Sequence, residues 1–164
     1  MIHLKPRGES RIRNGHPWVY RSDVAKVEAD AGAVVQVVGG RDLPLGYALF
    51  SDKSEIAVRM LTRGREAPDA AWWHSRIDEA VRYRESLKID ATAYRLIHGE
   101  ADRLPGLVVD RYGDYLVLQA LVQGVDRLLP DLTRALAERL SPAGILARND
   151  PRATHSLSST RVRG

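Results

Sequence analysis

The chain has 164 residues, of which 44% are hydrophobic and 28% are charged, and its formal net charge is +4. This balance is typical of a folded globular protein with one ordinary domain or two small ones, and it excludes a disordered chain. The sequence contains no cysteine, which excludes disulfides, thiolate metal sites and a cysteine nucleophile.

Charge is unevenly distributed along the chain. Residues 1–65 hold 11 Lys and Arg against 7 Asp and Glu, residues 66–147 hold 10 against 13, and residues 148–164 hold 4 against 1. Two functional parts with a basic tail are therefore expected. No apolar run approaches the roughly 20 residues of a membrane-spanning helix, and no apolar segment follows the basic amino terminus. A cytoplasmic protein without a signal peptide is expected.

The first part of the chain is predicted to be rich in β-strands. Alternating and β-branched runs, separated by Gly, Pro and Asp turns, predict strands at residues 2–4, 34–38, 45–51 and 55–62. Residues 8–15 predict one short helical turn, closed by Asn14 and Gly15, which tolerate the left-handed conformation that ends helices.

The second part mixes helices and strands. Residues 69–88 predict the longest helix, with Asp69 as its N-cap and Trp73 among the residues on its apolar face. Strands are expected at residues 94–98, 107–111, 115–121 and 145–147, with a tight hairpin turn at residues 112–114. Residues 126–140 predict a second helix, with Pro130 at or just past its first turn, where a missing N–H costs little.

Basic and aromatic residues cluster near the amino terminus. Arginine suits phosphate through its planar fork, and Trp18 and Tyr20 offer stacking faces for bases. We predict that RNA is contacted by Lys5, Arg7, Arg11, Arg13, Asn14, His16 and Arg21. The structural alternative is a solvated helical turn, with Trp18 buried in the core.

Other polar residues are interpreted as structural. His98, Glu100 and Asp102 are spaced too loosely for a zinc or magnesium site, so Glu100 and Asp102 are expected to accept hydrogen bonds from amides in the turn at residues 104–106. His16 has no serine or carboxylate at a spacing that completes a triad. We therefore assign no catalytic residue and no metal ligand. Residues 110–112 are expected to form an ion pair and a hairpin.

Two stretches resemble a known family. They are Arg11 to Tyr20 (RIRNGHPWVY) and Tyr94 to Gly113 (YRLIHGEADRLPGLVVDRYG). Together with residues 148–150 (RND), they are similar to the front portion of the large-subunit ribosomal RNA methyltransferase I family. The resemblance implies a PUA domain, a small β-β-α-β-β central domain and a class I methyltransferase domain. That family uses S-adenosylmethionine to methylate carbon 5 of a cytosine in 23S rRNA.

The resemblance implies an α+β fold with four parts. They are a PUA-like small β-barrel at residues 1–66, a linking helix at 67–92, a β-β-α-β central domain at 93–150 and a basic disordered tail at 151–164. The catalytic domain is expected to be absent, because no glycine-rich turn leads into a helix and no cysteine is present to add to carbon 6 of the base. The pattern also departs from the family after Asp150, and at Arg103, where many relatives carry glycine.

We expect the chain to be an RNA-binding, N-terminal part of a 23S rRNA (cytosine-5) methyltransferase-like protein. Its expected partners are 23S rRNA and a second copy of itself, with no cofactor of its own. S-adenosylmethionine is implied only for the full-length family. One alternative is a dimerisation or protein-interaction module with apolar surface around Tyr115, Val117 and Gln119. Another is a small enzyme that uses His98, Glu100 and Asp102.

Overall fold

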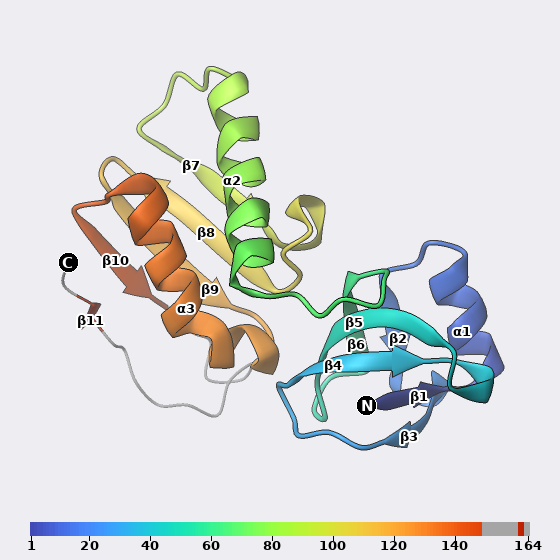
Figure 1. The fold of residues 1–164 in the computed structure, drawn as a ribbon. Coiled ribbons are helices and arrows are strands. Elements are labelled where there is room, and N and C mark those ends of the chain that lie inside the picture. The colour runs from blue at the N-terminus through green and yellow to red at the C-terminus, as the bar shows by residue number, and fades with distance from the viewer. Residues whose placement is uncertain (149–160, 163–164) are drawn as a thin grey trace. The chain divides into compact units, whose positions relative to one another are not determined.

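The computed structural model divides the chain into two units, Met1–Pro68 and Asp69–Gly164 (Figure 1). It describes residues 1–148 and the backbone of residues 161–162. Each unit has its own sheet. The expected α+β class is confirmed.

The first unit is a six-stranded sheet that curls around its core as a half-barrel (Figure 1). Its order is β2-β6-β5-β4-β1-β3, and its pairs are antiparallel except for β1 beside β4. The strands are β1 (Ile2–Leu4), β2 (Trp18–Tyr20), β3 (Val24–Val27), β4 (Val34–Val38), β5 (Pro44–Phe50) and β6 (Ile56–Thr62). Three helical segments connect them: α1 (Pro6–Arg13), η1 (Arg21–Asp23) and η2 (Gly40–Asp42).

Two strands of this sheet are absent from the prediction. Both β2 and β3 lie at the edges of the sheet and are only 3 and 4 residues long. Three residues of β3 are exposed, so the strand has no alternating apolar pattern by which the sequence would mark it. The length of the first helix was also underestimated. Helix α1 has 8 residues rather than a single turn, and Pro6 lies in its first turn.

The core of the first unit is formed by apolar residues from all its long strands and from α1. Ile2, Val19, Val37 and Val58 are fully buried, and Ile12 carries the buried face of α1. Burial of this kind contributes about 25 cal/mol for each Å² of apolar surface removed from water. The alternation expected in residues 55–62 is only partly observed, because Ala57 is buried as well as Val58 and Met60.

The second unit has a sheet of order β11-β10-β9-β8-β7. Strands β7 to β9 form an antiparallel meander, β10 lies parallel to β9, and β11 pairs antiparallel with β10. These strands are β7 (Ala93–His98), β8 (Leu107–Tyr112), β9 (Tyr115–Ala120), β10 (Gly144–Ala147) and β11 (Arg161–Val162). The predicted hairpin turn between β8 and β9 is confirmed. The expected tail at 151–164 lies outside the described residues, except for β11.

Two long helices cover the same face of this sheet, α2 (Ala70–Ser86) and α3 (Gln123–Leu140) (Figure 1). The predicted N-cap is confirmed, because Asp69 accepts a hydrogen bond from the backbone N–H of Trp72 at 2.8 Å. The position expected for Pro130 was wrong, since α3 begins at Gln123 and Pro130 lies inside the helix. Among the helices in this described part of the chain, none combines the length and the hydropathy that a membrane-crossing segment requires.

Gly46 is the position in the first unit where a side chain would do the most damage. Its φ is +140°, and an added Cβ would lie 2.1 Å from the carbonyl oxygen of Thr62 on the paired strand β6. We expect Gly46→Ala to lower the free energy of unfolding of this unit by about 2 to 4 kcal/mol. Amide hydrogen exchange of β5 and β6 measures the change. Gly64→Ala is the control, because nothing lies within 4 Å of its Cβ position; an equal loss in both variants would contradict the packing argument.

Candidate functional site

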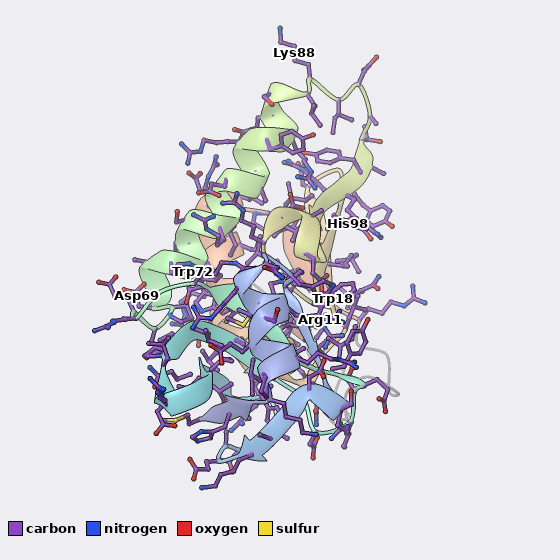
Figure 2. The ribbon with its side chains drawn as sticks, turned by 90° about the vertical axis from the view of Figure 1, so that its right-hand side faces the viewer. Arg11, Trp18, Asp69, Trp72, Lys88 and His98 are labelled. Atoms are coloured by element: carbon purple, nitrogen blue, oxygen red, sulfur yellow. The ribbon has the colours of Figure 1, made fainter. Side chains whose placement is uncertain are left out.

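The seven residues predicted to contact RNA lie on and around α1, on what is called here the α1 surface. Four of them, Arg11, Arg13, Asn14 and His16, belong to the second half of α1 and the turn that follows it. The other three, Lys5, Arg7 and Arg21, gather at the beginning of α1, beside η1. Arg11 on α1 and Trp18 at the start of β2 are labelled in Figure 2.

At the beginning of α1, basic side chains hold η1 in place. The Lys5 ammonium donates to the carbonyl oxygen of Ser22 at 2.8 Å, and Arg21 donates to the carbonyl oxygens of Asp52 and Ser54. Arg7 Nε lies 2.9 Å from Oδ1 of Asp23, whose side chain is only 5% exposed, whereas the Arg7 side chain is 71% exposed. Arg7 thus neutralises a buried carboxylate while most of its own surface faces solvent. Lys5 and Arg21, by contrast, use their side-chain donors on backbone carbonyl oxygens.

In the second half of α1, the Arg11 side chain contacts the rings of Tyr20 and His16. Its guanidinium carbon lies 4.9 Å above the centre of the Tyr20 ring, and Nη2 lies 3.2 Å from Nε2 of His16. The His16 ring contacts Trp18 edge-on, with ring centres 5.9 Å apart. Arginine held over an aromatic face keeps its charge and presents a planar donor. We call Arg11, His16, Trp18 and Tyr20 the aromatic cluster.

Three contacts hold the His16 ring. Nδ1 lies 3.2 Å from both the backbone nitrogen and the carbonyl oxygen of Trp18, and Nε2 lies 3.2 Å from Nη2 of Arg11. The ring is therefore fixed between the turn after α1 and the beginning of β2. Trp18 is half-buried, between the full burial of the structural alternative and an open stacking face.

Arg13 is paired with a carboxylate that also binds the backbone of η2. Arg13 Nη2 lies 2.8 Å from Oε1 of Glu9, one helical turn away, and Glu9 Oε2 accepts from the Gly40 N–H at 2.7 Å. The hydrogen bond from Gly40, followed by that from Arg13, lowers the pKa of Glu9 below its usual value. A Cβ at Gly39 would lie 2.4 Å from the same carboxylate. The Gly39-Gly40 turn therefore encloses the Glu9 carboxylate.

Arg63 is a functional candidate that the sequence did not reveal. It comes from the segment after β6, yet its guanidinium donates to the carbonyl oxygens of Ile12, Gly15 and His16. Carbonyl groups at the end of a helix lack partners within the helix, and a cation there is favoured by the helix dipole. Arg63 thus fixes the turn that carries Asn14 and His16. No local pattern marks this role, because Arg63 lies 47 to 51 residues along the chain from these carbonyls.

In the second unit, the long motif at residues 94–113 is held together by two ion pairs. Arg84 on α2 binds both oxygens of Asp102 at 2.6 and 2.7 Å, and the two side chains are only 10% and 9% exposed. Arg95 binds Asp110 at 2.8 Å. The expected ion pair at residues 110–112 therefore forms with β7 rather than within the segment.

The role predicted for Asp102 was wrong in detail. Besides Arg84, Asp102 accepts the backbone N–H of His98 at 2.6 Å, and not the amides of residues 104–106. A carboxylate saturated in this way has little capacity left for a metal ion. Within residues 1–148, the structure contains no group of three or more His, Asp or Glu side chains arranged to hold one.

The stability of the first unit should depend on pH through Glu9. Because the pKa of Glu9 is lowered in the folded state, its contribution is present above the ordinary carboxyl pKa, about 4.3, and is lost as the pH falls through the lowered value. We expect Glu9→Gln to reduce the free energy of unfolding by about 1 kcal/mol at pH 7 and by less below pH 4. Thermal unfolding at pH 7 and below pH 4 measures this loss of stability. Glu55→Gln, at an exposed side chain, is the control. The prediction would be contradicted if stability changed with pH in the same way in wild type and in both variants.

The Arg84–Asp102 pair is predicted to dominate the stability of the second unit. Asp102→Asn leaves a guanidinium with little exposure and no counter-charge, which should cost roughly 3 to 5 kcal/mol. Asp131→Asn is the matched control, since Asp131 pairs with Arg134 at 3.3 Å on the exposed side of α3. That control should change stability by less than about 0.5 kcal/mol. Urea unfolding compares the two variants, and similar losses in both would refute the assignment.

Comparison with known proteins gives one family match and several relatives. Residues 2–63 match the model of the PUA-like domain. The ribosomal RNA large subunit methyltransferase I of Shewanella amazonensis is 38% identical over 154 residues, covering 91% of this chain and 39% of that protein. The ribosomal RNA large subunit methyltransferase of Deinococcus radiodurans is 35% identical over 170 residues, covering 88% and 42%. The chain therefore spans about two fifths of the length of these relatives.

Solved structures share the fold. A protein from Streptococcus mutans, described as a SAM-dependent methyltransferase, superposes with a TM-score of 0.80 at 17% identity, over 90% of this chain and 40% of its own. A methyltransferase complexed with SAH superposes with a TM-score of 0.82 at 16% identity, over 98% and 43%. At these identities the likeness concerns the fold alone.

Proposed function

We propose that this chain, which corresponds to an N-terminal portion of the ribosomal RNA large subunit methyltransferase I family, binds structured RNA through its α1 surface. In this proposal the first unit, corresponding to residues 1–66, makes the RNA contact. The helix at 67–92 and the domain at 93–150 connect that contact to the rest of the protein. The proposed partner is 23S rRNA, and the relatives are named as methyltransferases of large-subunit ribosomal RNA.

The arrangement of Arg11 and Arg13 carries the proposal. Both arginines lie in the last turn of α1, and Arg11 stands over Tyr20 beside the half-buried ring of Trp18. Guanidinium groups bind phosphate through parallel N–H donors, and the adjacent rings suit an unstacked base. The exposed amide of Asn14 and the ring of His16 extend the same surface.

The remaining basic residues have supporting roles in this proposal. Arg7 contributes a solvent-facing charge, while Lys5 and Arg21 hold η1 and add to the positive field of the surface. Such charges give affinity for phosphate without reading sequence, so selectivity would come from the shape of the RNA.

Methyl transfer is not assigned to the described residues. S-adenosylmethionine is the methyl donor implied by the family, but the glycine pair that follows a strand, Gly39 and Gly40, is filled by Glu9. The sequence has no cysteine for the covalent addition that cytosine-5 methylation requires. The function proposed for this chain is therefore to hold and orient rRNA. Methylation of a cytosine is proposed for the family and not for the described residues of this chain.

Self-association is a second candidate. Tyr115 and Leu146 are exposed on the neighbouring strands β9 and β10, so the second unit has apolar surface that another copy would cover. Sedimentation of the protein at several concentrations separates this candidate from the first. A dimer with no affinity for RNA would favour it and would overturn the RNA-binding proposal.

The RNA-binding proposal predicts a strong dependence on salt. The dissociation constant for folded fragments of 23S rRNA, measured by fluorescence anisotropy, should rise at least about tenfold between about 50 and about 300 mM salt. Arg13→Gln should weaken binding about threefold, and the double variant Arg11→Gln/Arg13→Gln about tenfold, with a salt slope smaller by about 1 to 2.

Arg65→Gln is the control for these variants, because Arg65 is an exposed arginine of the first unit outside the α1 surface. It should change affinity by less than about twofold. Circular dichroism checks that the variants fold, since Arg11 is half-buried. Equal affinity at both salt concentrations, or an equal loss in Arg65→Gln and Arg13→Gln, would disprove the proposal.

A further inference from the structure

A groove within the second unit is separate from the α1 surface. It lies between the second half of α2, the end of β7 and the 3-10 turn η3 (Gly99–Asp102), and its volume is about 590 Å³. Pockets that bind small organic groups usually have about 300 to 1,000 Å³. The groove is therefore large enough for a nucleotide-sized group.

The acidic side chains at this groove are already neutralised. Asp102 is bound at both oxygens by Arg84, and Glu79 lies 2.6 Å from Nη2 of Arg76. A cation that enters the groove would have to compete with these arginines. An anion would meet Arg103, which lines the groove and has no counter-charge among the residues that the structure describes. The charge balance thus favours an anionic ligand.

Arg95 is oriented toward His98 while it remains charged. Its Nε binds Asp110 at 2.8 Å, and Nη1 lies 3.3 Å from Nδ1 of His98. The hydrogen bond with Asp110 raises the pKa of Arg95 further above its usual value. About half of the side chain, 45%, is exposed. Both oxygens of Asp110 bind Arg95, so Arg95 is a neutralised, half-exposed side chain held in a fixed position at the wall of the groove.

Arg103 is the cation at this groove with no partner to neutralise it. Its guanidinium makes no hydrogen bond or ion pair with any residue that the structure describes, and the residue is exposed. Its backbone is left-handed, with φ +59°. This left-handed residue is the C-cap of η3, a position that glycine occupies with less strain. The turn therefore needs the backbone conformation of Arg103 but not its side chain.

Tyr83 gives the groove an aromatic wall. It is 56% exposed, and the guanidinium carbon of Arg84 lies 5.0 Å from the centre of its ring. Because Arg84 is itself held by Asp102, the ring is supported by a fixed neighbour. Exposed tyrosines next to arginines are the platforms on which proteins stack unpaired bases, and the stacking tolerates any base.

We propose that this groove binds one unstacked nucleotide of a single-stranded RNA segment, with its base on Tyr83 and its phosphate on Arg103. The inference rests on the proposed function, RNA binding, and adds to it a second contact in a different unit. It predicts that the chain holds a folded element with the α1 surface and a single-stranded segment with the groove.

The test uses the full chain and a fluorescein-labelled uridine oligomer of about eight nucleotides, followed by fluorescence anisotropy. Arg103→Gly removes the free cation and relieves the left-handed strain, so stability should stay equal or rise while the dissociation constant rises about fivefold or more. Tyr83→Leu keeps an apolar side chain without a ring and should raise the dissociation constant about tenfold.

Lys88→Gly is the matched control. Lys88 is an exposed basic residue with φ +48°, so this variant also removes one charge and relieves a left-handed backbone. Figure 2 shows Lys88 after the end of α2, well away from His98 of the groove. The control should change affinity by less than about twofold. An equal loss in Lys88→Gly, or unchanged binding in both Arg103→Gly and Tyr83→Leu, would overturn the proposal.

Two further arms identify the ligand and separate this inference from the proposed function. Uridine monophosphate should compete far more weakly than the oligomer, and equal competition would mean a free-nucleotide site and would overturn the RNA assignment. Arg103→Gly should leave binding of folded rRNA fragments at the α1 surface within about twofold. Folded fragments could fail to bind while Arg103→Gly still weakens binding of the oligomer. That result would support the nucleotide site in the groove and contradict the proposed function of the α1 surface.

Discussion

The position of α1 depends on contacts that other segments make at both of its ends. A helix of 8 residues is too short to be stable alone, because forming its first turn costs more than its few hydrogen bonds return. At the first end, Arg7 binds the buried carboxylate of Asp23, and at the other end Arg63 binds three carbonyl oxygens. The basic residues of the α1 surface have defined positions because these contacts hold the helix against the half-barrel.

The same contacts divide the basic residues of the first unit into two groups. Lys5, Arg21 and Arg63 use their donors on backbone carbonyls, so their main effect is on the fold. Arg13 is bound by a single carboxylate and its side chain is 48% exposed, whereas the half-buried Arg11 contacts the side chains of Tyr20 and His16. An interface of this kind binds phosphate with groups that are already oriented, which lowers the entropy lost on binding.

In the second unit, most of the long sequence motif is explained by the fold. Asp102 and Asp110 neutralise Arg84 and Arg95, and the hairpin joins two strands of the meander. The backbone of Arg103 closes η3, but its guanidinium has no partner among the residues described. A side chain that the fold does not need is available to contact a ligand.

The sequence by itself determined the elements whose signals are local. The N-cap at Asp69, the hairpin turn at Gly113 and the long strands β4 to β6 follow from a few neighbouring residues. The short edge strands β2 and β3 and the role of Arg63 were decided only by the tertiary structure, because their partners lie far away in the chain. Composition likewise predicted a basic amino-terminal surface, but not which of its arginines are held by carbonyls and which remain accessible. That distinction depends on long-range contacts, which spacing and periodicity do not encode.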